Sequence, residues 1–285
     1  MLRSMYSGIS GMKNMQIKLD VIGNNIANVN TFGFKKGRIT FKDAMYQTIG
    51  SASGGTDTRG GINAKQVGLG SEIASIDTIH TESSLQNTSR PLDLAITNGD
   101  GYFVVNEGGQ QGGQHYFTRA GNFYIDDEGY LVNSDGYKVQ GYYPNSEGLN
   151  DIKIKRQEEK EIDDRKVTLE LQGISISQDG KIIAQYNDNS VRTIATIALA
   201  RFNNEEGLNK AGGNLYQAST NSGQPIFGIG GGAHGTVVSG KLEMSNVDLS
   251  EEFTEMIVAQ RGFQANSRII TTSDEILQEL VNLKR

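Results

Sequence analysis

The chain has 285 residues and a formal net charge of −6, which disfavours non-specific nucleic-acid binding because that requires an excess of basic residues. It contains no cysteine, so disulfides, iron–sulfur clusters, Cys-ligated zinc and thiol catalysis are excluded. The length predicts one or two domains. We also expect no membrane-spanning helix, and no cleavable signal peptide at the N-terminus.

Apolar residues recur every seven positions near the N-terminus, at Met5, Met12, Leu19 and Ile26. Leu2 and Ile9 lie three residues before the first two of these, which gives the a/d pattern of a helix that packs on another helix. Asn and Gly residues follow, and both tolerate the left-handed conformation that ends a helix. The pattern predicts a helix over 2–27.

The same spacing returns near the C-terminus, at Leu249, Met256, Phe263, Ile270 and Leu277. Asp248 followed by Glu251 is typical of a capping box at a helix start. The segment 248–283 contains no proline, which predicts one continuous helix about 54 Å long.

The two predicted helices carry opposite charge. Residues 1–43 contain seven basic and two acidic residues, whereas 248–285 contains four basic and seven acidic ones. Each apolar stripe fills about two positions in seven, fewer than the three usual for a helix on a globular core. These features favour helices that pack on helices, within the chain or between chains. The alternative is two amphipathic helices on one core.

The middle of the chain is predicted to be β. Glycine is frequent and proline scarce, with 36 and 3 residues, and Asp-Gly pairs separate short apolar runs, which is a strong hairpin signal. Strands are predicted at the following ranges: 102–105, 122–125, 130–132, 137–143, 174–177, 181–185 and 191–201.

Two segments differ from this pattern. Residues 46–70 are rich in Gly, Ser and Thr, which is typical of a flexible linker or an extended arm. Residues 151–166 form a run of mixed charges, for which we expect a solvated loop or a short exposed helix.

Groups that could support catalysis do not converge in the sequence. His80, His115 and His234 show no metal-ligand spacing, and adjacent carboxylates such as those at 126–128 point apart in a turn. The glycine-rich run at 230–235 lacks a following helix with lysine. We therefore expect no enzyme, no catalytic site, no cofactor and no metal.

Two terminal stretches, LDVIGNNIANVNTFGFKKGRITFKD (19–43) and residues 245–285, form a specific pair of motifs. The first is similar to the signature of the flagellar rod and hook proteins of bacteria, and the second resembles the C-terminal end of the same family. Residues 92–105 and 116–142 are similar to its β domain. The fold class expected is mixed α and β. It comprises a discontinuous, coiled-coil-like helical domain (1–30 and 248–285), an extended linker or arm (31–75) and a Gly-rich, mainly antiparallel outer β domain (76–247).

The resemblance implies a structural subunit that polymerises into a tube. The ends are most similar to the hook subunit, a flexible universal joint between rod and filament. The alternative is the distal rod subunit, which forms a stiff drive shaft and has an extra stretch where 46–70 lies. The expected partners are further copies of the chain, the distal rod, hook cap and hook–filament junction proteins, and the flagellar export apparatus. The expected location is the flagellum outside the cell.

We expect the assembly seam to consist of the apolar residues that follow the seven-residue spacing: Leu2, Met5, Ile9, Met12, Leu19, Ile22, Ile26, Leu249, Met256, Phe263, Ile270, Leu277 and Leu280. The family signature adds Asn24, Asn25, Asn28, Asn30, Thr31, Gly33 and Phe34. The asparagines have two interpretations: they end the helix, or their amides also bind neighbouring subunits.

A third function remains open at this point, namely a secreted β protein that binds or cleaves glycans. Such a protein needs a cleft with aromatic platforms and spaced carboxylates. The chain has 11 Tyr and 10 Phe but no Trp, so it lacks the residue that most often stacks on sugars.

Overall fold

The computed structural model describes residues 2–55, 59–108, 113–144, 146, 148–155, 157–162, 165–188 and 190–283. The chain forms two compact units. The helical unit comprises Met1–Asn28, Lys36–Ile79 and Val247–Arg285, and the β unit comprises Val29–Lys35 and His80–Asn246. The fold is mixed α and β with helices from both ends of the chain, as the sequence predicts. The expected arm over 31–75 is divided, because its first residues belong to the β unit.

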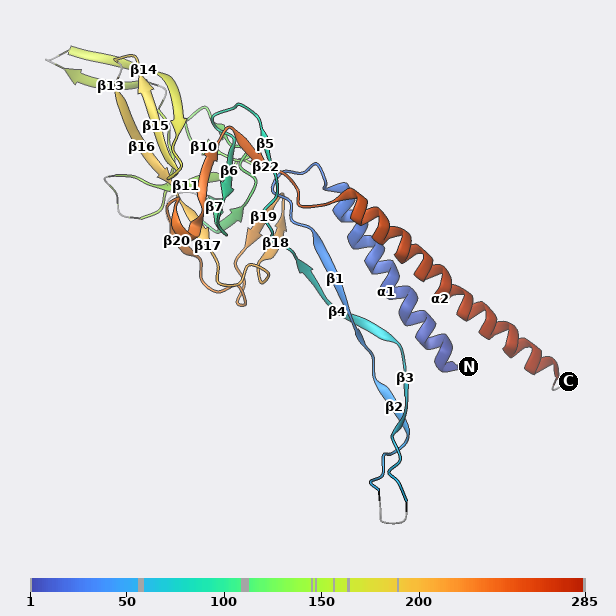
Figure 1. The fold of residues 1–285 in the computed structure, drawn as a ribbon. Helices are drawn as coiled ribbons and strands as arrows, with labels where there is room; N and C mark the ends of the chain where they lie inside the picture. The colour runs from blue at the N-terminus through green and yellow to red at the C-terminus, as the bar shows by residue number, and fades with distance from the viewer. Residues whose placement is uncertain are drawn as a thin grey trace. The chain divides into compact units, whose positions relative to one another are not determined.

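The described part of the helical unit contains two helices and two pairs of strands: α1 (Leu2–Ala27), α2 (Leu249–Leu283), β1 (Gly37–Asp43), β2 (Tyr46–Gly50), β3 (Lys65–Gly68) and β4 (Ser71–Thr78). The predicted helix ranges agree with these bounds to within one residue. The two helices lie side by side and run in opposite directions (Figure 1). Neither of them is long and apolar enough to cross a bilayer.

Small residues allow the two helices to approach closely. A Cβ atom on Gly8 would lie 3.3 Å from the Ile270 side chain, and one on Gly11 would lie 2.7 Å from the Asn266 side chain. A Cβ atom on Gly262 would lie 3.1 Å from Met15. Since interhelical distance depends on the side chains at the contact, these glycines fix the antiparallel register. The ion pair between Lys18 and Glu255 is a further contact between the two helices in the same register.

The Gly/Ser/Thr segment forms a paired arm. Strands β1 and β4 pair antiparallel, β2 and β3 extend the same hairpin, and Ser53 and Ile62 form an isolated bridge beyond them. Backbone hydrogen bonds between the two strands hold such a hairpin without a hydrophobic core. Over the described residues, the segment is therefore a paired, extended arm, with register shifts at Thr40/Phe41 and Thr48/Gly50, and not an unstructured linker.

Within its described residues, the β unit contains eighteen strands and one 3-10 helix: β5 (Leu85–Asn87), β6 (Leu94–Thr97), β7 (Tyr102–Asn106), β8 (His115–Thr118), β9 (Tyr124–Ile125), β10 (Leu131–Val132), β11 (Lys138–Tyr142), β12 (Asn150–Asp151), β13 (Gln157–Ile162), β14 (Arg165–Ile176), β15 (Lys181–Tyr186), β16 (Val191–Ile197), β17 (Leu199–Arg201), β18 (Asn209–Gly212), β19 (Leu215–Gln217), β20 (Ile226–Gly228), η1 (Gly232–His234), β21 (Thr236–Ser239) and β22 (Lys241–Glu243). The main sheet follows the order β13-β14-β15-β16-β11-β7-β8-β19-β18. All described strand pairs are antiparallel, as predicted.

Strand β7 lies at the centre of the β unit. Tyr102 and Val104 belong to one buried apolar cluster, whereas Phe103 and Val105 belong to another. Because successive side chains of a strand point to opposite faces, β7 is covered on both sides. This agrees with its sequence, which is a continuous apolar run and not an alternating one.

The predicted hairpins are present, with two differences from the sequence-based expectation. The predicted strand 191–201 is interrupted at Ala198, because its first part pairs with β15 and β11 whereas its last part pairs with β7. The charged run, expected to be a loop or a short helix, contributes β13, which pairs with β14 in register from Gln157 and Glu170 to Ile162 and Arg165. Strands pair through hydrogen bonds between backbone groups, so the charged side chains of this run do not predict whether it forms a strand.

Candidate functional site

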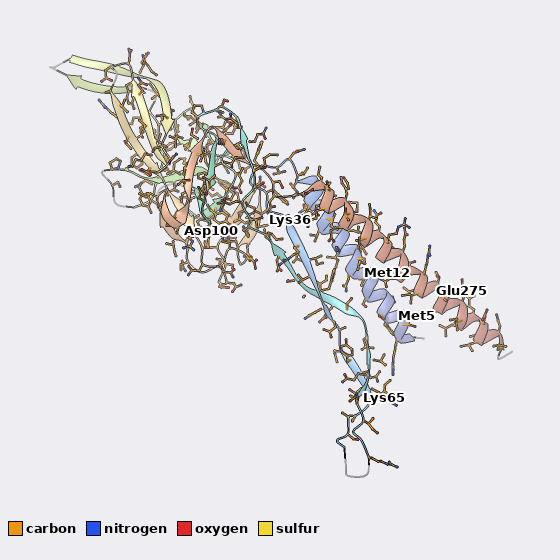
Figure 2. The ribbon with its side chains drawn as sticks, viewed as in Figure 1. Met5, Met12, Lys36, Lys65, Asp100 and Glu275 are labelled. Atoms are coloured by element: carbon orange, nitrogen blue, oxygen red, sulfur yellow. The ribbon has the colours of Figure 1, made fainter. Side chains whose placement is uncertain are left out.

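The predicted seam residues of α1 are partly covered by other parts of the helical unit. Ile22 is buried, with 4% of its surface exposed, and Met5, Met12, Leu19 and Ile26 are half-buried. Ile9 is exposed, and the side chain of Leu2 lies outside the described part of the structure. Figure 2 shows Met5 and Met12 along α1.

In α2, the predicted residues divide into two groups. Met256, Ile270 and Leu277 are half-buried, whereas Leu249, Phe263 and Leu280 are exposed. The seven-residue spacing of α2 therefore marks side chains that are covered within the chain at only some of the predicted positions. The structure shows one half of the predicted capping box, because Asp248 Oδ1 accepts hydrogen bonds from the Ser250 and Glu251 backbone N–H groups. The Glu251 carboxylate instead accepts a hydrogen bond from Lys36 Nζ.

Further apolar side chains of α2, which the seven-residue spacing does not include, are exposed. Phe253 and Ile257 follow Leu249 at intervals of four residues, so the three lie along one flank of the helix. A second exposed set is Val258, Ile269, Ile276, Val281 and Leu283. A soluble monomer rarely exposes large apolar patches unless they bind a partner. A search for four-residue spacing would have found the first set.

Asn25 has a role that neither interpretation of the signature predicts. Its amide donates to the Gly37 carbonyl and to Glu252 Oε2, and it accepts from the Gly37 N–H. Asn25 and Glu252 are buried. A buried amide with three partners is satisfied, so Asn25 connects α1, the start of β1 and the first turn of α2 within one chain.

The other signature asparagines differ in their surroundings. Asn28 follows the last residue of α1, and its backbone N–H and its side-chain amide both donate to the Asn24 carbonyl. Its role in ending the helix stays a prediction. Asn24 and Asn30 are exposed. Binding of their amides to a neighbouring subunit therefore remains a proposal for these two positions.

Gly33 and Phe34 belong to the β unit. Gly33 has a φ of +69°, and a Cβ atom there would lie 2.6 Å from the Ala120 backbone nitrogen. Only glycine fits both conditions without strain. Phe34 lies below the Lys210 ammonium group, 5.1 Å from the ring centre, and Thr31 is half-buried. These residues hold segment 29–35 in the β unit.

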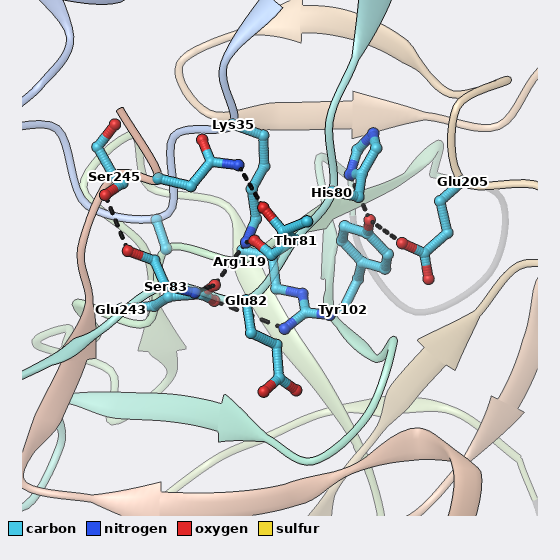
Figure 3. Close-up of polar contacts among 12 residues, drawn as sticks. Lys35, His80, Thr81, Glu82, Ser83, Tyr102, Arg119, Glu205, Glu243 and Ser245 are labelled. Carbon is cyan, nitrogen blue, oxygen red and sulfur yellow. Dashed lines mark hydrogen bonds and ion pairs between the residues drawn. The ribbon is translucent and has the colours of Figure 1, made fainter. Parts of the chain in front are cut away.

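Three charged side chains meet in the interior of the β unit, and we call Lys35, Arg119 and Glu243 the buried clasp (Figure 3). Lys35 is 0% exposed, and Arg119 and Glu243 are each 1% exposed. Lys35 Nζ lies 2.5 Å from Glu243 Oε1, and Arg119 Nη1 lies 3.5 Å from Glu243 Oε2. Burial lowers the pKa of Lys35, although Glu243 opposes that shift.

The buried clasp joins three segments of the β unit. Each of them lies next to a point at which the chain passes from one unit to the other. Lys35 Nζ donates to the Thr81 carbonyl, and the Ser83 N–H donates to Glu243 Oε1. Ser83 Oγ donates to the Ser245 carbonyl. Segments 29–35, 80–84 and 241–246 are thus held together around one carboxylate. Removing one member of such a group leaves a buried charge without its partner, which is strongly destabilising.

A second polar group lies beside the clasp. The Tyr102 hydroxyl is 2.7 Å from His80 Nδ1 and 3.1 Å from Glu205 Oε2. Burial, with Lys35 and Arg119 nearby, lowers the pKa of His80 to about 4. Burial, with Asp100 nearby, raises the pKa of Glu205 to about 7. These shifts favour the neutral form of His80 and the protonated form of Glu205. None of the pockets described for the structure is lined by His80, Tyr102 or Glu205.

No group of three or more metal-ligating side chains occurs within the described residues. His80 contacts Tyr102, His115 lies beside Phe227, and His234 lies 3.2 Å from the Ile226 carbonyl oxygen. The three histidines are therefore found in three different surroundings. The acidic residues at 126–128 occupy the turn between β9 and β10, which matches the hairpin prediction.

Three family profiles match the chain. The one described as "Flagella basal body rod protein" matches residues 5–35, "Flagellar hook protein FlgE/F/G D1 domain" matches 95–184, and "Flagellar basal body rod FlgEFG protein C-terminal" matches 238–283. The flagellar basal-body rod protein FlgG of Bacillus subtilis is 54% identical over 291 residues, with both chains covered completely. This chain belongs to the flagellar rod and hook protein family. The family expected from its two ends is confirmed.

Two further relatives separate the rod and hook branches of the family. The basal-body rod protein FlgG of Borreliella burgdorferi is 38% identical over 296 residues, with both chains covered completely. The hook protein FlgE of the same organism is 32% identical over 446 residues, again with both chains covered. The chain is thus a flagellar axial structural protein, and these identities favour the rod alternative over the hook.

Proposed function

We propose that this chain is the subunit of the distal rod, which polymerises into a stiff tube that transmits torque. The observation that carries the proposal is the 54% identity to a basal-body rod protein along the whole length of both chains. The sequence-based preference for the hook is given second place for this reason.

Length supports the same choice. The alignment with the rod protein of Bacillus subtilis spans 291 positions, close to the 285 residues of this chain. The alignment with the hook protein of Borreliella burgdorferi spans 446 positions, so that hook protein has long segments without a counterpart here. A hook subunit of this type would need outer material that this chain lacks.

Assembly would use the two helices. The exposed apolar residues of α2 gain burial only if another subunit covers them, and apolar burial contributes about 25 cal/mol per Å². Because the contact joins different surfaces of successive copies, it leads to an open helical polymer. The other partners are neighbouring axial proteins of the flagellum and its export apparatus, and the location is the flagellum outside the cell.

The arm favours a rigid shaft. Strands β1 to β4 form one continuous antiparallel hairpin over the described residues, and apolar side chains along it, including Met45, Tyr46, Ile49 and Ile62, are exposed. A paired arm with apolar side chains can brace one subunit against the next. A flexible joint would use the same segment for compliance instead.

Deleting the gene and imaging the basal bodies tests the proposal. Cells without this protein should have basal bodies that lack the distal rod, and therefore also lack a hook. A complete rod without a curved hook would assign the chain to the hook instead. Shortening the arm between 51 and 63 should change the bending stiffness of isolated structures, and unchanged stiffness would remove the arm from this account.

A further inference from the structure

The arm has an inner part, strands β1 and β4, and an outer part, strands β2 and β3. The inner strands contact α1. At the junction of the two parts, the Ala44 N–H donates to the Gly70 carbonyl at 2.9 Å and the Leu69 N–H donates to the Met45 carbonyl at 3.1 Å, so the hairpin is continuous. All residues of β2 and β3 except Gly50 are exposed. The orientation of the outer part therefore depends on the contacts at this junction.

A side chain of α1 holds the arm at the junction. Asn14 is 6% exposed, and its Nδ2 donates to the Ser71 carbonyl at 2.9 Å and to Ser71 Oγ at 2.8 Å. Ser71 is the first residue of β4 and pairs with Asp43, the last residue of β1. One buried amide therefore connects α1 to the outer ends of both inner strands. Because a buried polar group that loses its partner costs free energy, this contact resists movement of the strands away from α1.

Gly70 brings the backbone of the arm onto the surface of α1. Its φ is +123°, and a Cβ atom there would overlap Ser10 Oγ and would lie 3.3 Å from Ser7 Cα. Ser10 Oγ is itself held, because it donates to the Ser7 carbonyl at 2.9 Å. Only glycine accepts this backbone conformation and this close approach without strain. Ser7, Ser10 and Asn14 have the spacing that places side chains on one face of a helix.

We call Ser7, Ser10, Asn14, Gly70 and Ser71 the arm seat, and all five belong to the helical unit. We propose that the arm seat fixes the direction in which the arm leaves α1, so that Asn14 and Gly70 are positioning residues for the contact between the arm and the next subunit. This inference rests on the proposed function, because a next subunit exists only in a polymer. An isolated two-stranded hairpin is marginally stable in water. Attachment to a helix gives such a hairpin a fixed direction.

Distances between spin labels test this inference with the full-length protein. The chain has no cysteine, so Gln16→Cys on α1 and Lys65→Cys on β3 give two specific labelling sites, and both residues are exposed. Figure 2 shows Lys65 on the arm. Labelled chains are polymerised with an excess of unlabelled wild-type protein, so that each measured pair lies within one chain. The distance distribution should be at least about twofold broader with Asn14→Ala or Gly70→Ala than without them, because a released junction lets the arm change direction.

Two matched controls change the arm away from its seat. Ser75→Ala removes hydrogen bonds within the hairpin, to Thr40 and Asp77. Gly54→Ala adds a Cβ atom with no other atom within 4 Å. Both controls should keep the wild-type width of the distribution. The inference is overturned if Asn14→Ala keeps that width, or if the controls broaden the distribution as much as the seat variants do.

Hydrogen exchange of the unpolymerised chains gives a second measurement, which does not depend on assembly. The Ala44 and Leu69 amide hydrogens should exchange about tenfold faster in Asn14→Ala than in the wild type, because local opening of the junction becomes easier. Equal rates would overturn the inference. The proposed function is tested separately by the deletion strain. Basal bodies without a distal rod would support that function even with the arm seat disproved, whereas a complete rod would remove it.

Discussion

In the β unit, every side chain of the segment 102–105 is fully buried, whereas along the 35 residues of α2 the buried ones are Glu252, Ala259 and Ser273. A strand at the centre of the β unit is thus covered on both faces by its own chain. The longest helix has its large apolar side chains half-buried or exposed.

This difference assigns two tasks to two parts of one chain. The β unit has the apolar clusters of a domain that folds from a single chain, together with a buried clasp in which Lys35 and Arg119 share the Glu243 carboxylate. The helical unit has an antiparallel helix pair with exposed apolar flanks, which neighbouring subunits would cover in the polymer that we propose. Helices gain most of their stability from such packing and little from intrinsic propensity.

The largest expected effect separates the two tasks completely. Removing α2, or removing residues 2–28, should abolish polymerisation while the β unit still unfolds cooperatively in urea. The reason is that the apolar clusters of the β unit, as far as the structure describes them, contain no residue from either helix. Electron microscopy and sedimentation measure assembly, and circular dichroism measures folding. Tubes of normal form built from the truncated chain would contradict the comparison.

The next largest effect concerns the buried clasp. Glu243→Gln leaves Lys35 and Arg119 buried without their counter-charge, so the free energy of unfolding should fall by about 3–5 kcal/mol. Glu255→Gln is the matched control, because Glu255 is 48% exposed in its pair with Lys18 and should change stability by less than about 1 kcal/mol. Urea denaturation measures both values. Equal effects would mean that burial of the clasp is unimportant.

The sequence predicts both helices because long seven-residue repeats are local signals. It does not predict the clasp, since Lys35, Arg119 and Glu243 lie far apart in the chain and only the fold brings them together. The predicted seam is only partly the helix contact, because Gly8, Gly11 and Gly262 occupy positions that an apolar pattern does not score. The role of Asn25 is likewise tertiary, since its partners include Glu252.

A smaller effect is expected at Gly33. Gly33→Ala should lower the free energy of unfolding of the β unit by about 2 kcal/mol or more, because the backbone there is left-handed and the space is filled. Gly23→Ala is the control within the same signature region, since no atom lies within 4 Å of its added Cβ and alanine favours a helix by about 1 kcal/mol. Thermal unfolding of both variants measures the contrast. A neutral Gly33→Ala would contradict the fit described for segment 29–35.

The smallest effect is a pH dependence with two opposing parts. The pKa of His80 is lowered to about 4, so its contribution to stability is present above the ordinary value of about 6.5 and is lost as pH falls toward 4. The pKa of Glu205 is raised to about 7, so its contribution is present below about 4.5 and is lost as pH rises toward 7. The two changes cancel in part in the wild-type protein.

Single variants reveal each part. Glu205→Gln should leave a protein whose free energy of unfolding increases between pH 4 and 6.5, by about 1–2 kcal/mol. His80→Gln should leave one whose free energy decreases between pH 4.5 and 7. Urea denaturation across this range measures both slopes, and slopes of the same sign in the two variants would exclude the proposed environments.

Chemical footprinting of α2 in the monomer and in the polymer tests the central claim most directly. Phe253 and Ile257 are 49% and 58% exposed in the single chain. A carbene probe should label both side chains in the monomer and label them at least about fivefold less in the polymer, because a second copy covers them. The buried residues of β7 should react little in either state. Equal labelling of Phe253 and Ile257 in both states would contradict the claim that neighbouring subunits complete the helical unit.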